Sequence, residues 1–146
     1  MRHFLKWLAF CAASALSPAA FAQDATTYPF DGPFEDATFA VENAIIGRGL
    51  VVDHTSHVGE MLARTGADVG SDIVLFDAAD AYLFCSAVLS RKVMEADPLN
   101  IAHCPYSVFV IDRAGKVEVG YRNMPQGAMQ EVQQLLDAIA REATGQ

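Results

Sequence analysis

Apolar and polar positions recur along this chain with two different periods, so both strands and amphipathic helices are expected. Thr26–Phe30 is a candidate strand, and Asp31-Gly32-Pro33 is typical of a turn. A helix should begin at Phe34, because the apolar positions that follow recur with the helical period of 3.6 residues. These positions are Phe34, Ala37, Val41, Ala44 and Ile45. Gly47 and Gly49 mark the end of this helix.

The middle of the chain predicts shorter elements. Leu50–His57 alternates β-branched and polar residues and is expected to be a strand, and Val58–Thr65 is expected to be a short helix. Ile73–Phe76 and Tyr82–Phe84 are extended candidates on either side of a polar turn at Asp77–Asp80.

The last third predicts a helix, a hairpin and a second helix. Ser86–Ala96 has helical spacing and ends at Asp97-Pro98. His103–Asp112 and Lys116–Arg122 alternate in the manner of strands, and the glycine-containing loop between them is typical of a β-hairpin. Gly127–Ala143 carries the clearest apolar stripe. Without repeats, low-complexity tracts or linkers, these elements predict one α+β domain.

The first 22 residues have the order of a secretory signal peptide. Arg2 and Lys6 supply a positive start, Trp7–Leu16 is an uncharged apolar run, and Ala20 and Ala22 form an A-x-A cleavage site. An uncleaved anchor would need about 20 apolar residues, and this run is shorter. Lipidation at the single cysteine of the segment is disfavoured because a bulky phenylalanine precedes it. We therefore expect cleavage after Ala22 and a periplasmic or secreted protein.

Processing changes the charge and the inventory of reactive residues. Loss of Arg2 and Lys6, with no acid lost, moves the formal net charge from −8 to −10. The expected mature chain, residues 23–146, is a single domain with two cysteines and three histidines. An acidic surface argues against nucleic acid and anionic lipid as partners. No second apolar run is long enough to cross a membrane.

Cys85 and Cys104 remain after processing, and an oxidising compartment favours a disulfide between them. Closing the loop of 18 intervening residues would stabilise the fold by about 3 kcal/mol. Topology decides whether the bond can form. If the strands that adjoin the two cysteines run parallel, the sulfurs lie about 17–20 Å apart. If the strands run antiparallel, with the helix from Ser86 as an excursion, both cysteines lie at the same end.

Cys85 has a second possible role because it immediately precedes a predicted helix. Free N–H groups at a helix start stabilise a thiolate and lower the thiol pKa, which makes Cys85 the best candidate for a reactive or ligating atom. Alternatively, Cys85 is a buried free cysteine that acts as a small apolar residue. The structural roles, disulfide or core residue, are favoured over a reactive or ligating role.

The three histidines offer a weak case for a metal site. His54 and His57 lie on opposite faces of a regular strand, and only a strand that ends at Ser56 would let both turn inward. His103 and Cys104 also oppose each other. Thiolate and imidazole suit zinc or copper, but no ligand pair has the spacing of a dedicated site. No nucleophile elbow, phosphate loop or C-x-x-C pair is present, so the sequence carries no catalytic signature and no cofactor is predicted.

Two stretches of the chain resemble the family called domain of unknown function 302. They are Val51–Gly70 (VVDHTSHVGEMLARTGADVG) and Phe84–Asp112 (FCSAVLSRKVMEADPLNIAHCPYSVFVID), followed by the strand Lys116–Arg122 (KVEVGYR). The resemblance spans roughly Thr26–Arg122. It implies a fold of the TATA-binding-protein-like class, with a curved antiparallel sheet and helices on one face. It therefore favours the antiparallel alternative and the disulfide.

The resemblance also bears on the individual cysteines. It implies that the position of Cys85 is more widely shared than Cys104-Pro105-Tyr106, and that members occur with and without signal peptides. A shared Cys85 favours a role beyond a disulfide. The family has no established biochemical activity, so the resemblance implies a fold and leaves function open.

Three functional hypotheses follow. The leading one is a non-enzymatic module that binds a small ligand or a protein where His57, Glu60, Cys85 and Cys104 converge. The second is a thiol redox or sulfur-handling protein that uses Cys85 and Cys104. The third is metal or haem-iron ligation by His57 and Cys85. A homodimer surface is a further possibility at the hairpin side chains, although core packing is the favoured use of these residues. They are Tyr106, Phe109 and Tyr121.

Overall fold

The computed structural model describes residues 24–146, and the predicted signal peptide lies outside this range. The elements in chain order are β1 (Ala25–Pro29), α1 (Phe34–Ile46), β2 (Val52–Ser56), α2 (Val58–Thr65), the short 3₁₀ helix η1 (Ala67–Val69), β3 (Ala78–Phe84), α3 (Ala87–Ala96), the 3₁₀ helix η2 (Pro98–His103), β4 (Tyr106–Arg113), β5 (Lys116–Arg122) and α4 (Gln130–Thr144).

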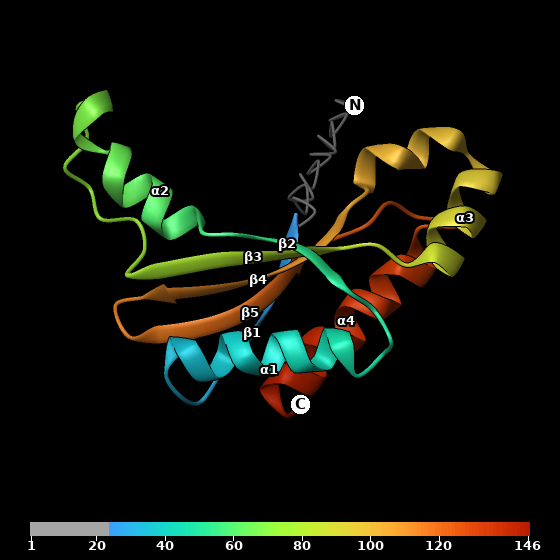
Figure 1. The fold of residues 1–146 in the computed structure, drawn as a ribbon, viewed down its shortest axis with the longest axis horizontal. Coiled ribbons are helices and arrows are strands. Elements are labelled where there is room, and N and C mark those ends of the chain that lie inside the picture. Colours follow the sequence, from blue (N-terminus) through green and yellow to red (C-terminus); the bar gives the residue numbers. More distant parts are fainter. Residues whose placement is uncertain (1–23) are drawn as a thin grey trace, which may run out of the picture.

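Within these residues the strands form one antiparallel sheet in the order β1-β5-β4-β3-β2 (Figure 1). Helices α1 and α4 pack together on one face, as Figure 1 shows below the strands. The predicted α+β fold with an antiparallel sheet is confirmed, and the sheet is open. The helices were expected on one face only, but helix α2 lies at one end of the opposite face. Helix α3 and η2 lie at the other end of the strands. The face between them is called the open face below.

The hydrophobic core fills the space between the sheet and the helices α1 and α4. Alternate residues of the strands point into it, and the helices contribute the stripes that the sequence predicts. The largest fully buried side chains are Tyr106, Phe84, Ile45, Met129, Leu136, Ile139, Val41, Val93, Val108, Val110, Val119 and Val132. Each such apolar side chain contributes about 1.5–3 kcal/mol through burial, so this core is the main source of stability.

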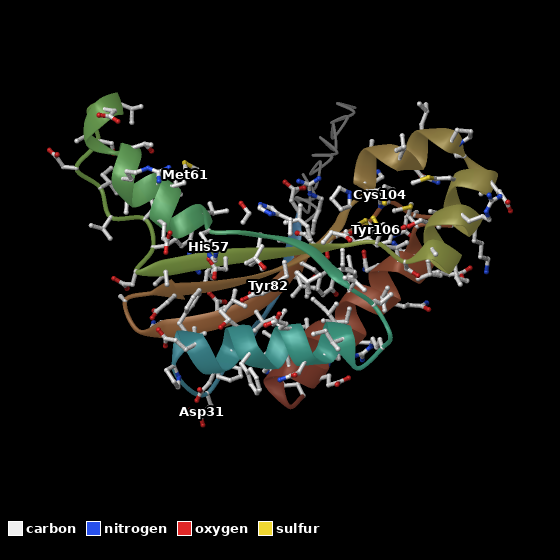
Figure 2. The ribbon with its side chains drawn as sticks, in the orientation of Figure 1. Asp31, His57, Met61, Tyr82, Cys104 and Tyr106 are labelled. Atoms are coloured by element: carbon white, nitrogen blue, oxygen red, sulfur yellow. The ribbon has the colours of Figure 1, made fainter. Side chains whose placement is uncertain are left out.

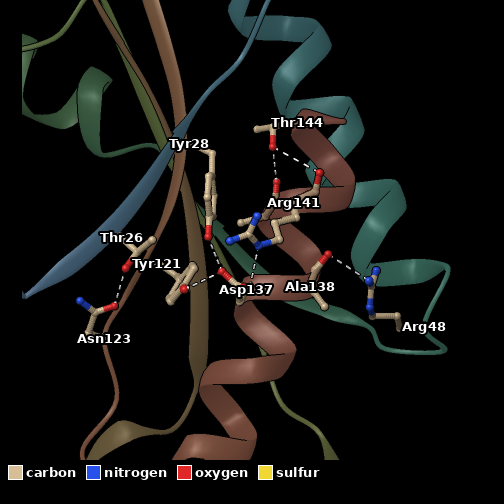
Figure 3. Close-up of polar contacts among 10 residues, drawn as sticks. Thr26, Tyr28, Arg48, Tyr121, Asn123, Asp137, Ala138, Arg141 and Thr144 are labelled. Atoms are coloured by element: carbon tan, nitrogen blue, oxygen red, sulfur yellow. Dashed lines mark hydrogen bonds and ion pairs between the residues drawn. The ribbon is translucent and has the colours of Figure 1, made fainter. Parts of the chain in front are cut away.

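A polar cluster fixes α4 against the edge of the sheet (Figure 3). The hydroxyl groups of Tyr28 and Tyr121 both donate to Asp137 Oδ1, at 2.5 and 2.9 Å. Arg141 Nε donates to the other carboxylate oxygen at 2.8 Å, and its guanidinium lies 4.7 Å from the centre of the Tyr28 ring. The cluster joins β1, β5 and α4, and its members are satisfied by one another.

Two strand predictions differ from the structure. Ile73–Phe76 was expected to be extended in a strand, but it belongs to an irregular connection, and residues predicted as a turn instead begin β3. The polar residues at Asp77–Asp80 were interpreted as a turn, although β3 begins at Ala78. Asp77 Oδ2 accepts a hydrogen bond of 2.6 Å from the backbone N–H of Ala114, which ties the start of β3 to the β4–β5 turn. In addition, the strand predicted to reach His57 ends at Ser56.

The connection between α3 and β4 also differs from the one predicted from the sequence. Residues after Asp97 form η2, which was not predicted, and the strand expected from His103 begins at Tyr106. Asp97 caps η2 by accepting from the backbone N–H of Leu99 at 2.9 Å. The hairpin itself is confirmed. Its turn residues Ala114 and Gly115 have φ angles of 55° and 76°, which matches the right-handed twist of the strands.

Candidate functional site

The open face of the sheet carries a groove with a volume of about 410 Å³. This sheet groove has an apolar part and a polar part, which is the usual composition of a small-molecule site. Its lining residues are Ser56, Ala81, Leu83, Ala102, His103, Cys104, Pro105, Ser107, Arg122 and Met124.

Strand register brings these residues together. Ser56 of β2 is opposite Ala81 of β3, and Leu83 is opposite Ser107 of β4. Paired residues share a face, so all four point away from the core. Arg122 ends β5, and η2 supplies one wall. The groove therefore crosses four neighbouring strands.

Four polar side chains in the groove are not committed to other protein groups. Ser56, Ser107 and Arg122 make no side-chain hydrogen bond or ion pair with the described residues. His103 Nδ1 is removed from solvent and has no partner within residues 24–146. Buried nitrogen atoms are nearly always satisfied, and an unpaired one costs about 1–3 kcal/mol. The two serine hydroxyls and the guanidinium beside the apolar floor are free to contact a ligand.

The cysteine pair lies beside the groove. Cys104 lines it, and its Sγ lies 3.4 Å from Cys85 Sγ, both as free thiols. Ser90 Oγ lies 3.7 Å from Cys104 Sγ and donates to the hydroxyl of Tyr106 at 3.2 Å. The adjoining strands β3 and β4 are antiparallel neighbours, so the antiparallel alternative is confirmed and both cysteines lie at the same end of the sheet.

The expected low pKa of Cys85 is wrong. Partial removal of water from its sulfur, the adjacent Cys104 thiol and the carboxylate of Asp53 raise the pKa of Cys85 to about 11. The helix start does not compensate, because α3 begins two residues later at Ala87. The Ser86 hydroxyl already accepts from the backbone N–H of Leu89 at 3.3 Å. At neutral pH Cys85 is a thiol.

His57 and Glu60 lie at the opposite end of the molecule from the cysteines. Figure 2 shows His57 beside α2 and Cys104 near α3. His57 Nδ1 is 2.8 Å from Asp80 Oδ1, and Cys85 follows five residues farther along β3, about 17 Å away for an extended chain. Glu60 is exposed in the first turn of α2. The structure therefore does not bring the four expected residues together, and haem or metal ligation by His57 and Cys85 fails on distance.

The remaining predicted residues add no metal centre. His54 shares the face of Leu83 by register, and its side chain is exposed outside the groove lining. Among residues 24–146 no three His, Cys, Asp or Glu side chains gather closely enough to hold a metal ion. His103 lines the groove beside Cys104, so these two predicted residues are brought together.

The hairpin aromatics divide between the two faces of the sheet. Tyr106 and Tyr121 are buried in the core, and core packing is therefore their use. Phe109 lies on the open face, where its ring covers Gly120. A Cβ at Gly120 would lie 2.5 Å from the Phe109 ring, so glycine is required there. Only Phe109 of the three could contribute to a surface for a second copy.

The sequence of residues 26–146 matches the family described as "Domain of unknown function DUF302". The chain belongs to this family. A solved structure, "Crystal structure of uncharacterized conserved protein DUF302 from Bacillus stearothermophilus", is similar to this DUF302 domain with a TM-score of 0.68 at 16% identity. The match covers 84% of this chain and 99% of that chain, and at this identity it establishes the fold alone. No curated protein matches the sequence.

Sequence reasoning missed the polar half of the groove. Ser56, Ser107 and Arg122 carry no motif, and each is an ordinary polar residue on a strand. Asp80, the partner of His57, was expected only as part of the polar turn at Asp77–Asp80. The signal that could have found Ser107 and Arg122 was the alternation itself, since both fall on the polar side of the predicted hairpin strands. Within the described range, no helix has the length and apolar character needed to cross a bilayer.

Proposed function

We propose that this DUF302 protein is an exported, non-enzymatic module that binds a small ligand in the sheet groove. The observation that carries the proposal is the groove of about 410 Å³ on the open face, lined by four uncommitted polar side chains and an apolar floor. Among the residues that the structure describes, no hydrogen bond joins a nucleophile to a base in this groove. The residues expected to converge from α2 are not part of this site.

Export is the second part of the proposal. It is supported by the positive, apolar and A-x-A order of the first 22 residues. Processing after Ala22 would leave a strongly acidic chain in the periplasm or the medium, without affinity for nucleic acid. In that oxidising compartment we propose a disulfide between Cys85 and Cys104. The proximity of the two thiols and the antiparallel strands that carry them support this bond.

Thiol–disulfide exchange is the second candidate function, and the contact between the two sulfurs favours it. In this reaction the Cys85–Cys104 disulfide would accept two electrons and two protons from a partner dithiol, which becomes a disulfide. The raised pKa of Cys85 argues against it, because Cys85 is a leaving group in this reaction and a thiol of high pKa leaves slowly. Reduction of the disulfide by millimolar glutathione would support an exchange function. A disulfide that resists millimolar glutathione would show that the bond is structural.

Native mass spectrometry of the processed protein, purified from its own compartment without reductant, tests the binding proposal. Wild-type protein should carry a small-molecule adduct that is released on denaturation. Ala81→Phe fills the floor of the groove and should remove the adduct. Ala87→Phe makes the same change at an exposed position outside the groove and should retain it. A wild-type protein without any adduct, or an Ala81→Phe protein that retains it, would contradict the proposal.

A further inference from the structure

We infer that the ligand of the sheet groove is a small organic anion, whose charged group binds Arg122 and whose apolar part lies on Ala81 and Leu83. This inference rests on the proposed function, because it names the ligand class of the same groove. Three features of the groove carry it: an unpaired cation, the absence of acidic side chains, and hydroxyl and imidazole groups without partners.

The cation of the groove, Arg122, forms no ion pair with the described residues. Most cationic side chains of the described region are neutralised, since five of the eight Lys and Arg residues in 24–146 form ion pairs. Arg122 is not paired within that region, although the chain contains 18 acidic residues against 10 basic ones. Arg64 and Lys116 are also unpaired there, but neither lines the groove. The groove therefore holds an exposed arginine that has no acidic partner among the described residues.

The rest of the lining has the matching electrostatic character. None of the described residues that line the groove is Asp or Glu, despite the acidity of the chain as a whole. A carboxylate in the lining would repel an anion and would pair with Arg122. Because neither effect operates here, the guanidinium is available to form two parallel hydrogen bonds with a carboxylate, sulfonate or phosphate group.

Neutral hydrogen-bonding groups extend the anion site from Arg122 along the groove. Ser107 follows in register from the pair Val108 and Tyr121, which places it beside Arg122 on the neighbouring strand. Its hydroxyl has no partner among the described residues, and the ring of His103 at the η2 wall has none either. Hydroxyl and imidazole groups can each donate to an anionic oxygen.

The apolar floor determines the remainder of the ligand. Ala81 and Leu83 of β3 lie between Ser56 on one side and Ser107 on the other, and Met124 and Pro105 complete the apolar lining. The groove extends over about 14 Å, which corresponds to three strand spacings. A short aliphatic or aromatic body fits this floor better than a bare inorganic anion does. The chemistry thus indicates an amphiphilic monoanion.

Calorimetric titration with three ligands of one chain length tests the inference on the processed protein. The ligands are octanoate, octanol and octylammonium, which carry an anionic, a neutral and a cationic head. Octanoate should bind at least about tenfold more tightly than octanol, and octylammonium should bind least. Arg122→Gln should weaken octanoate binding about tenfold and leave octanol binding unchanged. Arg122→Lys keeps the charge but loses the planar guanidinium. Its octanoate affinity should lie between those of wild type and Arg122→Gln.

Arg64→Gln is the matched control, because it removes the same charge from an unpaired arginine outside the groove. It should leave octanoate binding unchanged. Equal affinities for octanoate and octanol, or an Arg122→Gln protein that retains full octanoate affinity, would overturn the anion inference. Binding of octanol that Ala81→Phe abolishes would still support the groove itself. If none of the three ligands binds, the inference is wrong, and the proposed function is then judged by the adduct in native mass spectrometry.

Discussion

The hydroxyl of Tyr121 on β5 donates a hydrogen bond to Asp137 Oδ1 on α4, with 2.9 Å between the two oxygens. The Tyr121 side chain is only 3% exposed. Tyr28 on β1 donates to the same carboxylate oxygen. Removal of water from around Tyr121 and its hydrogen bond to a negative group raise the pKa of the phenol, so it stays protonated and remains a donor. One carboxylate therefore connects the edge strand, its neighbour and the last helix.

Replacement of this carboxylate should destabilise the fold. In Asp137→Ala the buried hydroxyl of Tyr121 loses its acceptor, which costs about 1–3 kcal/mol of the free energy of unfolding. Urea denaturation measures the loss as a lower midpoint with an unchanged slope. Glu131→Ala is a suitable control on the same helix, because it removes an exposed ion pair with Lys92 and should cost less than about 1 kcal/mol. Equal losses for the two variants would refute a special role for Asp137.

The same carboxyl should contribute to stability in a pH-dependent way. Burial acts to raise the pKa of Asp137, but hydrogen bonds from Tyr28, Arg141 and Tyr121 outweigh it, so this pKa lies below its ordinary value. A lowered pKa gives stability that is present above the unfolded-state pKa of about 3.9 and is lost as pH falls through the folded-state pKa. The stability difference between wild type and Asp137→Asn should hold near neutral pH and shrink below about pH 4. Urea midpoints measured from pH 7 to pH 2.5 test this, and a difference that grows on acidification would contradict it.

The fold was predictable where periodicity reports burial. The stripes of α1 and α4 and the alternation of β4 and β5 each follow from one buried face, and the structure has these elements within a few residues of the prediction. The region before β3 was not predictable in this way. Ile73, Val74 and Leu75 are apolar but exposed, so their composition suggested a strand that no partner pairs with. Apolar composition indicates burial only where a partner surface exists.

The site was less predictable than the fold, because its polar residues come from separate strands and share no motif. Ser56, Ser107 and Arg122 meet through register, and register depends on the whole sheet. Cys104 was found because cysteines are rare and their chemistry is distinctive. His57 was misplaced because β2 and β3 run antiparallel, so the register that pairs Ser56 with Ala81 brings His57 to Asp80, at the other end of β3 from Cys85.

The proposed disulfide should stabilise the processed protein. Cys85→Ser and Cys104→Ser should each lower the free energy of unfolding by about 3 kcal/mol without reductant, since the bond restricts the unfolded chain across the α3–η2 excursion. The two variants and wild type should become similar in stability when dithiothreitol is present, and this forms the internal control. Thiol titration of the denatured wild-type protein should detect no free thiol before reduction. Two free thiols in protein taken directly from its compartment would show that no bond forms there.

The contact between His57 and Asp80 should hold the start of α2 in a pH-dependent manner. The hydrogen bond and charge of Asp80 raise the pKa of His57 above its ordinary value, with a smaller contribution from the charge of Glu60. A raised pKa gives stability that is fully present below about pH 6.5 and is lost as pH rises through the folded-state value. Titration followed by NMR of the His57 ring should therefore give a pKa above 6.5, and Asp80→Asn should lower it.

Hydrogen exchange across α2 tests the structural consequence of that contact. Gly59 lies so close to β3 that a Cβ there would be 2.6 Å from the backbone nitrogen of Ala79, so the helix is seated on the sheet directly beyond His57. Amides of α2 should exchange faster at pH 8 than the intrinsic pH effect predicts, and Asp80→Asn should remove this excess. Glu95→Gln, which changes the same net charge on α3, should not alter it. If Asp80→Asn and wild type keep the same pH profile in α2, the ion pair does not hold the helix.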